Sequence, residues 1–209
     1  MARRYDPGRR ERIIDAALRV IGRDGIGGLS HRTVAAEADV PLGSTTYHFA
    51  SLDELLTAAL RRTNANFVSA VREATGLTAP GADLAAGVAR LMGDWMAAGR
   101  AGAELEYELY LAALRRPVLR PVVAEWTRDV VEMLTRHTDP VTARALVAVM
   151  DGISLQVLLN GTEYDEEYAR EMLARILAGS PAGAGRGAGA SPAPGPGCET
   201  GSLPDRGPR

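Results

Sequence analysis

Apolar residues recur at intervals of three and four along most of the chain, and this spacing predicts amphipathic helices. Valine and isoleucine are present, but they do not alternate over the length of a strand. The first expected helix spans 9–23, and Asp24-Gly25 is expected to end it. The pattern therefore indicates an all-α fold. The buried stripe of the first helix consists of Ile13, Ile14, Ala17, Leu18 and Ile21.

Two short helices are expected next, at 31–38 and 42–49, with the turn between them at 39–40. Ser30 is a good N-cap for the first of them. Pro41 suits the first turn of the second, because proline has no amide hydrogen to lose there. The Ser-Leu-Asp-Glu sequence at 51–54 is a capping box that opens a longer helix. A helix followed by such a tightly joined pair is typical of a helix-turn-helix unit that places its second short helix in the DNA major groove.

Further helices are expected at about 83–98, 101–115, 118–137, 141–160 and 165–178, with glycine or proline between them. From residue 179 onward, 15 of the 31 residues are Gly or Pro, so no core can form there and the tail is expected to be disordered. The chain thus divides into a three-helix DNA-binding domain at 1–50, a larger helical domain at 51–178 and a Gly/Pro/Ala-rich tail at 179–209.

The distribution of charge favours a nucleic-acid contact at the N-terminal end. Residues 1–50 carry eight Arg against six acidic residues, whereas 51–178 carry thirteen Arg against eighteen. The single cysteine, Cys198, lies in the tail, and the three histidines show no metal-ligand spacing, so we expect no disulfide, metal or cofactor. There is no long apolar run, and no apolar signal core follows the basic N-terminus. We therefore expect a cytoplasmic protein with no membrane partner.

The second short helix carries the residue types that a DNA-reading helix needs. Short side chains allow close approach to the groove, hydroxyls reach base edges, and flanking polar groups hold phosphates. The Thr45 side chain is expected to matter more for sequence specificity than Tyr47. The alternative is a surface helix pair in an ordinary helical protein. The predicted contact set is Arg32, Thr33, Gly43, Ser44, Thr45, Thr46, Tyr47 and His48.

The N-terminal arginines leave two interpretations open. Arg3, Arg4, Arg9 and Arg10 form either an arm near the minor groove or a solvated basic end.

The pattern T-V-A-x-E-A-x-V-P-x-G-S-T-x-Y-H-F-x-S-x-D-E-L-L, from Thr33 to Leu56, resembles the DNA-binding region of TetR-family transcriptional regulators. The resemblance covers essentially residues 9–178. It departs from the family pattern at Asp39, where glycine is frequent, at Thr45-Thr46, where Leu-Tyr is frequent, and at Leu52, where a phosphate-holding lysine is frequent. The missing lysine puts one backbone contact in doubt.

The resemblance implies that 51–178 binds a small effector and forms a homodimer that reads a palindromic operator. It implies a four-helix dimer interface built from 141–160 and 165–178. The segment 141–160 is apolar on several faces, as a helix with a partner would be. The effector itself is unknown.

Large apolar and aromatic residues in the second domain are candidates for lining an effector pocket, and plain core packing is the alternative for each of them. Glu104, Glu106 and Glu108 punctuate one apolar helix. One of them meets a cationic ligand, or they are solvated or paired with Arg115 or Arg116. The candidate pocket residues are Met92, Trp95, Met96, Tyr107, Glu108, Tyr110, Leu111, Trp126 and Met150.

The predicted function is a sequence-specific transcriptional regulator, a repressor released from a palindromic operator by a small-molecule effector. The alternatives are an activator, a ligand-independent regulator of the same fold, and a helical enzyme with a pocket in the second domain. Against the enzyme, the sequence offers no paired nucleophile and base, no phosphate loop and no metal set.

Overall fold

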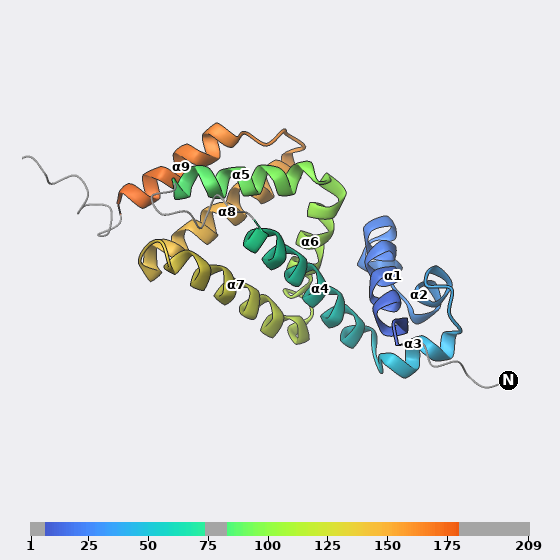
Figure 1. Ribbon diagram of the computed structural model, residues 1–209. Helices are drawn as coiled ribbons and strands as arrows, with labels where there is room; N and C mark the ends of the chain where they lie inside the picture. Colours follow the sequence, from blue (N-terminus) through green and yellow to red (C-terminus); the bar gives the residue numbers. More distant parts are fainter. Residues whose placement is uncertain (1–6, 74–82, 180–209) are drawn as a thin grey trace, which may run out of the picture.

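The computed structural model describes residues 7–73 and 83–179, and within these ranges the regular structure is entirely helical. A head formed by α1, α2 and α3 lies at one end, a body formed by α5 to α9 lies at the other, and α4 runs from the head into the body (Figure 1). The all-α prediction is confirmed. In chain order the elements are α1 (Arg9–Asp24), η1 (Ile26–Gly28), α2 (His31–Glu37), α3 (Leu42–His48), α4 (Leu52–Glu73), α5 (Leu84–Ala97), α6 (Arg100–Ala112), η3 (Pro117–Leu119), α7 (Arg120–Thr135), α8 (Pro140–Asn160) and α9 (Glu166–Ala178).

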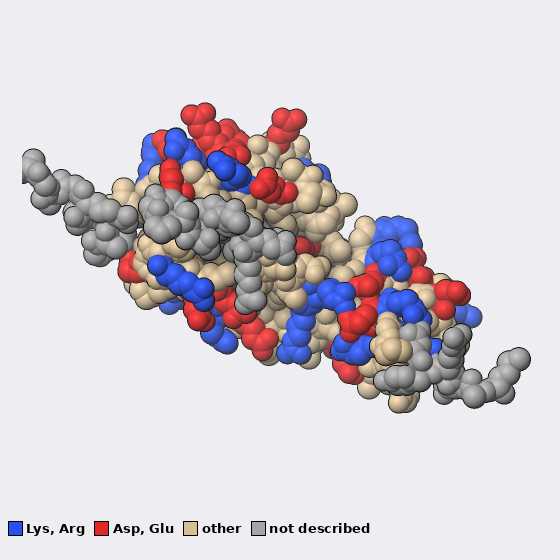
Figure 2. All heavy atoms as spheres, in the orientation of Figure 1, with Lys and Arg blue, Asp and Glu red and all other residues tan. Residues whose placement is uncertain are grey.

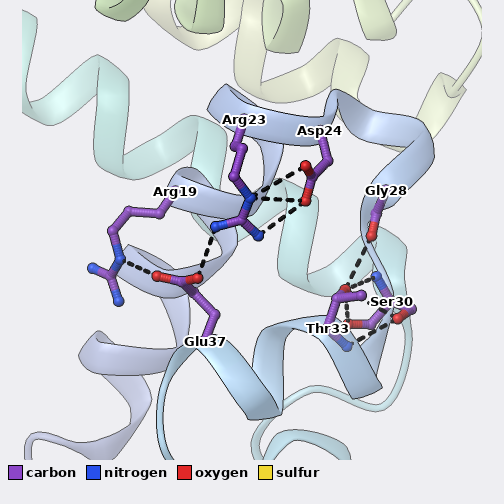
Figure 3. A network of polar contacts seen from close by, with 7 residues as sticks. All are labelled: Arg19, Arg23, Asp24, Gly28, Ser30, Thr33 and Glu37. Atoms are coloured by element: carbon purple, nitrogen blue, oxygen red, sulfur yellow. Dashed lines mark hydrogen bonds and ion pairs between the residues drawn. The ribbon is translucent and has the colours of Figure 1, made fainter.

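The start of α2 is fixed by a reciprocal cap. The Thr33 backbone N–H donates to Ser30 Oγ at 3.0 Å, and the Ser30 backbone N–H donates to Thr33 Oγ1 at 2.9 Å (Figure 3). Both groups would otherwise be unpaired at the helix end. The turn into α3 places Asp39 at a φ of 52°, a left-handed conformation that favours glycine and that aspartate tolerates better than most residues. Asp39 can therefore make this turn where the family that the sequence resembles frequently has glycine.

An exposed ionic network joins α1 to α2. Arg19 donates to Glu37 at 2.7 Å, and Arg23 donates to Glu37 at 3.0 Å and to Asp24 at 2.9 Å (Figure 3). The hydrogen bonds from Arg19 and Arg23 lower the pKa of Glu37. Positive and negative side chains are interspersed over the head face seen in Figure 2, so many of the head arginines there are neutralised within the fold.

The hydrophobic core of the head extends past residue 50 into the body. Leu55, Leu56 and Leu60 of α4 are buried against α1, and Leu109 of α6 and Leu119 of η3 belong to the same cluster. Polar contacts also cross this junction: the backbone N–H of Ile26 donates to Glu108 Oε1 of α6 at 2.7 Å, and Arg62 of α4 pairs with Asp15 of α1 at 2.9 Å. The head therefore rests directly on α4 and α6.

A second core lies in the body, where α5 packs on α9 and α7 packs on α8. The Tyr164 hydroxyl donates to the Ala89 carbonyl at 2.7 Å, and its ring lies 3.1 Å from where a side chain on Gly93 would begin. By length and composition α8 could span a membrane, but buried helices of globular proteins pass the same test. Val141 and Leu159, at either end of α8, remain 77% and 80% exposed.

Candidate functional site

The outward face of α3 carries Gly43, Thr46 and Tyr47. Tyr47 is 82% exposed, and a side chain added at Gly43 would meet no atom within 4 Å. The half-buried His48 ring makes an edge-on contact with the Tyr47 ring, with 5.2 Å between centroids. Arg32 lies exposed in the first turn of α2. Together these groups present a small hydrogen-bonding surface with open space for close approach by a nucleic acid.

The prediction that Thr45 reads a base edge is wrong. Thr45 is 0% exposed, and its hydroxyl donates to the Leu42 carbonyl at 2.8 Å. Positions four apart share a helix face, so Thr45 lies on the inward side with Phe49, which is also 0% exposed. Thr45 therefore occupies a core position of the head.

Ser44 is likewise turned inward and is 2% exposed, so its predicted DNA contact is also wrong. Its Oγ has no hydrogen-bond partner among the described residues. Thr33 is exposed, but its hydroxyl donates to the Gly28 or Ser30 carbonyl, both 3.0 Å away. That hydroxyl serves the cap of α2, which leaves it no free proton for a phosphate.

Two further features bear on the expected phosphate contacts. Leu52, at the position of the family's lysine, packs against the head core. Arg10 lies over the Phe49 ring, 5.1 Å from its centroid, and pairs with Glu11. Arg3 and Arg4 lie outside the described residues, as do Cys198 and all of the predicted disordered tail except Gly179.

The body contains a cavity that is partly open to solvent, and the space in and around it, open solvent included, is about 710 Å³. Five helices contribute to it: α4, α5, α6, α7 and α8. The lining residues are Leu60, Thr63, Asn64, Phe67, Leu91, Met92, Trp95, Glu106, Tyr107, Tyr110, Trp126, Val130, Val147, Met150, Asp151 and Ser154.

Five aromatic rings form a continuous chain along this cavity, each in tilted or edge-on contact with the next. The centroid separations are 6.0 Å for Trp95–Tyr107, 6.2 Å for Tyr107–Tyr110, 5.7 Å for Tyr110–Trp126 and 5.8 Å for Trp126–Phe67. Tilted and edge-on pairs of aromatic rings are favourable because of the ring quadrupoles. The face of each ring also attracts a cation.

Two carboxyl groups face the same space. Glu106 Oε2 accepts from Trp95 Nε1 at 3.1 Å, and burial raises the pKa of Glu106 to about 7 against the opposing effect of this hydrogen bond. Asp151 Oδ1 accepts from the Tyr107 hydroxyl at 3.2 Å, and burial also raises the pKa of Asp151. The described lining contains no Arg, Lys or His. The cavity is aromatic and acidic, which suits an aromatic ligand carrying positive charge.

Two family models match the chain. The model for "Bacterial regulatory proteins, tetR family" matches residues 13–59, and the model for "Tetracyclin repressor-like, C-terminal domain" matches residues 79–179. Together they span most of the sequence, the head with one and the cavity-bearing body with the other.

The chain belongs to the TetR family.

Individual relatives of this TetR-family protein include the nicotine-responsive transcriptional repressor HdnoR of Paenarthrobacter nicotinovorans. HdnoR is 30% identical over 160 residues, which cover 71% of this chain and 82% of HdnoR. The multidrug binding protein EbrR is 65% identical in its complex with ethidium, with a TM-score of 0.77 and coverage of 81% of this chain and 98% of EbrR. Its complex with malachite green gives the same identity, a TM-score of 0.75 and coverage of 82% and 99%.

Six of the nine predicted pocket residues of this TetR-family protein line the cavity: Met92, Trp95, Tyr107, Tyr110, Trp126 and Met150. Met96, Glu108 and Leu111 do not. Leu111 is partly solvent-exposed. Glu108 faces the head, because one face of α6, with residues 105, 108, 109 and 112, packs against the head core. The face with residues 106, 107 and 110 lines the cavity.

The sequence alone did not point to Asp151 or Phe67 as pocket residues, and it left Glu106 as one of three glutamates that could meet a cationic ligand. A signal for Glu106 was present in the sequence, since it precedes Tyr110 by four residues and so shares its helix face. The other two α6 glutamates have different partners: Glu104 pairs with Arg100 at 2.8 Å, and Glu108 accepts from the backbone of Ile26. The alternative that these glutamates pair with Arg116 is not what the structure has, because Arg116 pairs with Asp53 at 2.5 Å.

Proposed function

We propose that this TetR-family protein is a homodimeric repressor that binds a palindromic operator through α3 and is released from it by a small aromatic cation. The observation that carries the proposal is the body cavity, where five aromatic rings and two carboxyl groups line one space without a basic residue among them. Such a regulator acts in the cytoplasm, where its DNA is.

The choice of an aromatic cation follows from the lining chemistry. Ring faces attract cations by about 0.5–2 kcal/mol each, more strongly where water is excluded. A buried carboxyl group without a cationic partner favours a ligand that supplies the missing charge. The relatives support this choice, because EbrR binds ethidium and malachite green, both aromatic cations, and HdnoR responds to nicotine, which joins a pyridine ring to a basic amine.

The operator contacts are assigned to the outward face of α3. Gly43, Thr46 and Tyr47 face solvent there, and Arg32 and His48 flank them. In a two-fold dimer, two such helices would enter major grooves separated by about one helical turn, roughly 34–36 Å, or a multiple of it. The dimer contact is assigned to α8 and α9, where Val141, Leu159 and Tyr168 leave apolar surface exposed.

Helix α6 contacts both the cavity and the head, so it can transmit ligand binding in the cavity to the head. It presents Glu106, Tyr107 and Tyr110 to the cavity, while Leu105 and Glu108 contact the end of α1 and η1. A ligand that displaces α6 would strain the bond from Ile26 to Glu108 and shift the head. Release requires the ligand to bind the free state more tightly than the DNA-bound state.

The experiment is a titration of the purified protein onto labelled duplexes covering the DNA upstream of its gene, followed by addition of malachite green. We expect salt-sensitive, sequence-specific binding that the dye reverses, with the dye recovered unchanged. Chemical conversion of the ligand would favour an enzyme instead. Failure to bind any duplex would overturn the proposal.

A further inference from the structure

Glu106 is one of two carboxyl groups that line the cavity, and each of the two accepts a single hydrogen bond there. Its one hydrogen bond among the described residues comes from Trp95 Nε1, and no cation pairs with it there. Its neighbours on the same helix are satisfied, since Glu104 pairs with Arg100 and Glu108 binds the backbone of Ile26. Glu106 is therefore a partly buried acid without a cationic partner in the described lining, and a proton or a ligand can compensate its charge.

The groups that face Glu106 across the cavity are almost all neutral. Helix α4 contributes a hydroxyl and an amide, α5 an indole, and α7 an indole and an aliphatic side chain. Helix α6 adds the phenols of Tyr107 and Tyr110, and burial raises the pKa of both. The remaining acid is Asp151 of α8, which accepts the hydrogen bond from Tyr107. The cavity has no cation of its own to hold Glu106 ionised.

We propose that Glu106 is the counter-ion for the charged nitrogen of the effector, and that the effector enters by displacing a proton from this carboxyl group. The proposal rests on the aromatic-cation effector of the proposed function. The exchange balances simply: the neutral carboxylic acid and the free cation give the carboxylate–cation pair and a solvated proton. No covalent bond other than the acid O–H changes.

Position distinguishes Glu106 from Asp151. The Trp95 indole that orients Glu106 is also the first ring of the aromatic chain, so a cation lying against that ring is beside the carboxyl group. Asp151 instead holds the Tyr107 hydroxyl and thereby fixes the orientation of the next ring. Glu106 is thus the ligand-contacting group, and Asp151 is a positioning residue.

The pKa of Glu106, about 7, sets the size of the effect. Below this pH the free cavity carries the proton, and a permanent cation must displace it. Above this pH the carboxylate is already present. Affinity for a permanent monocation should therefore rise about tenfold between pH 6 and pH 8, and about half a proton should leave per cation bound at pH 7.

The test is calorimetric titration of the full-length protein with ethidium, without DNA, at pH 6, 7 and 8. At pH 7 it is repeated in two buffers of different ionisation enthalpy, which counts the protons released and needs no variant. The expected results are the tenfold tightening and the fractional proton. Ethidium binding with no proton release and no pH dependence would overturn this inference while leaving the aromatic-cation effector intact. No ethidium binding at any pH would overturn both.

Variants of single residues show which carboxyl group releases the proton when ethidium binds. Glu106→Gln should abolish proton release and flatten the pH profile, with affinity at pH 8 about tenfold below wild type. Glu104→Gln, on the same helix but exposed and paired with Arg100, is the matched control and should behave as wild type. If Asp151→Asn removes the proton release and Glu106→Gln leaves it, the assignment to Glu106 is wrong. Circular dichroism of each variant checks that it is folded.

Discussion

Helices α3 and α6 both mix polar and apolar residues, yet they use opposite faces for function. On α3 the outward residues Thr46 and Tyr47 are available to a partner, while the inward Thr45 is tied to a carbonyl of its own helix. On α6 the inward Glu106 and Tyr107 face a cavity. A buried polar group satisfied within its own helix belongs to the scaffold, whereas one left without a charge partner in a cavity is a candidate for binding.

The largest expected effect concerns the inward face at the end of α3. Phe49→Ala removes a fully buried ring from the head core, and we expect a loss of about 3–5 kcal/mol in the free energy of unfolding. Urea denaturation followed by circular dichroism measures it. A loss below about 1 kcal/mol would mean that the inward face of α3 does not support the head.

The next effect concerns the outward face. Tyr47→Ala should lower operator affinity about tenfold, or about 1.4 kcal/mol, with little change in stability, because its side chain is almost fully exposed. Anisotropy of a labelled operator measures it. Thr45→Val is the matched control on the inward face. It should cost about 1 kcal/mol of stability and leave base preference unchanged. If Thr45→Val relaxed sequence specificity and Tyr47→Ala did not, the assignment of the two faces would be reversed.

The smallest expected effect concerns the junction between α6 and the head. Glu108→Gln keeps the size of the side chain but weakens the charge-assisted bond from the Ile26 N–H, which is 2.7 Å long. We expect unchanged ethidium affinity and about a fivefold change in the dye concentration needed to release DNA. Parallel calorimetry and anisotropy separate the two quantities. Equal shifts in both would show that Glu108 acts on the cavity and not on the link to the head.

The helices were predictable because their ends carry local signals. Ser30, Asp83, Asp139 and Asp165 each accept a backbone hydrogen bond at a helix start, and the expected range 141–160 differs from α8 by one residue. The direction of a side chain in a seven-residue helix is not a local property. Thr45 and Thr46 look alike in sequence, and packing of α3 against its neighbours decides which one is buried.

The cavity was predictable in kind but not in detail. Large residues such as Trp95 and Tyr107 stood out by size, and the structure places both in the lining. The roles of the glutamates depend on groups far away in sequence. Glu108 accepts a hydrogen bond from Ile26 of the head, 82 positions earlier. Glu106 accepts one from Trp95 across the turn between α5 and α6. Such partners follow from tertiary packing, which helical periodicity does not encode.

The central claim is that an aromatic cation in the body cavity releases the head from DNA. Its most direct test is the anisotropy of a labelled operator duplex bound by the protein and titrated with malachite green, with Glu106→Gln on the same duplex as the control for any effect of the dye on DNA. The account predicts complete release of wild type, with the variant needing about tenfold more dye at pH 8. A wild-type protein that binds the dye and stays on the operator would contradict it.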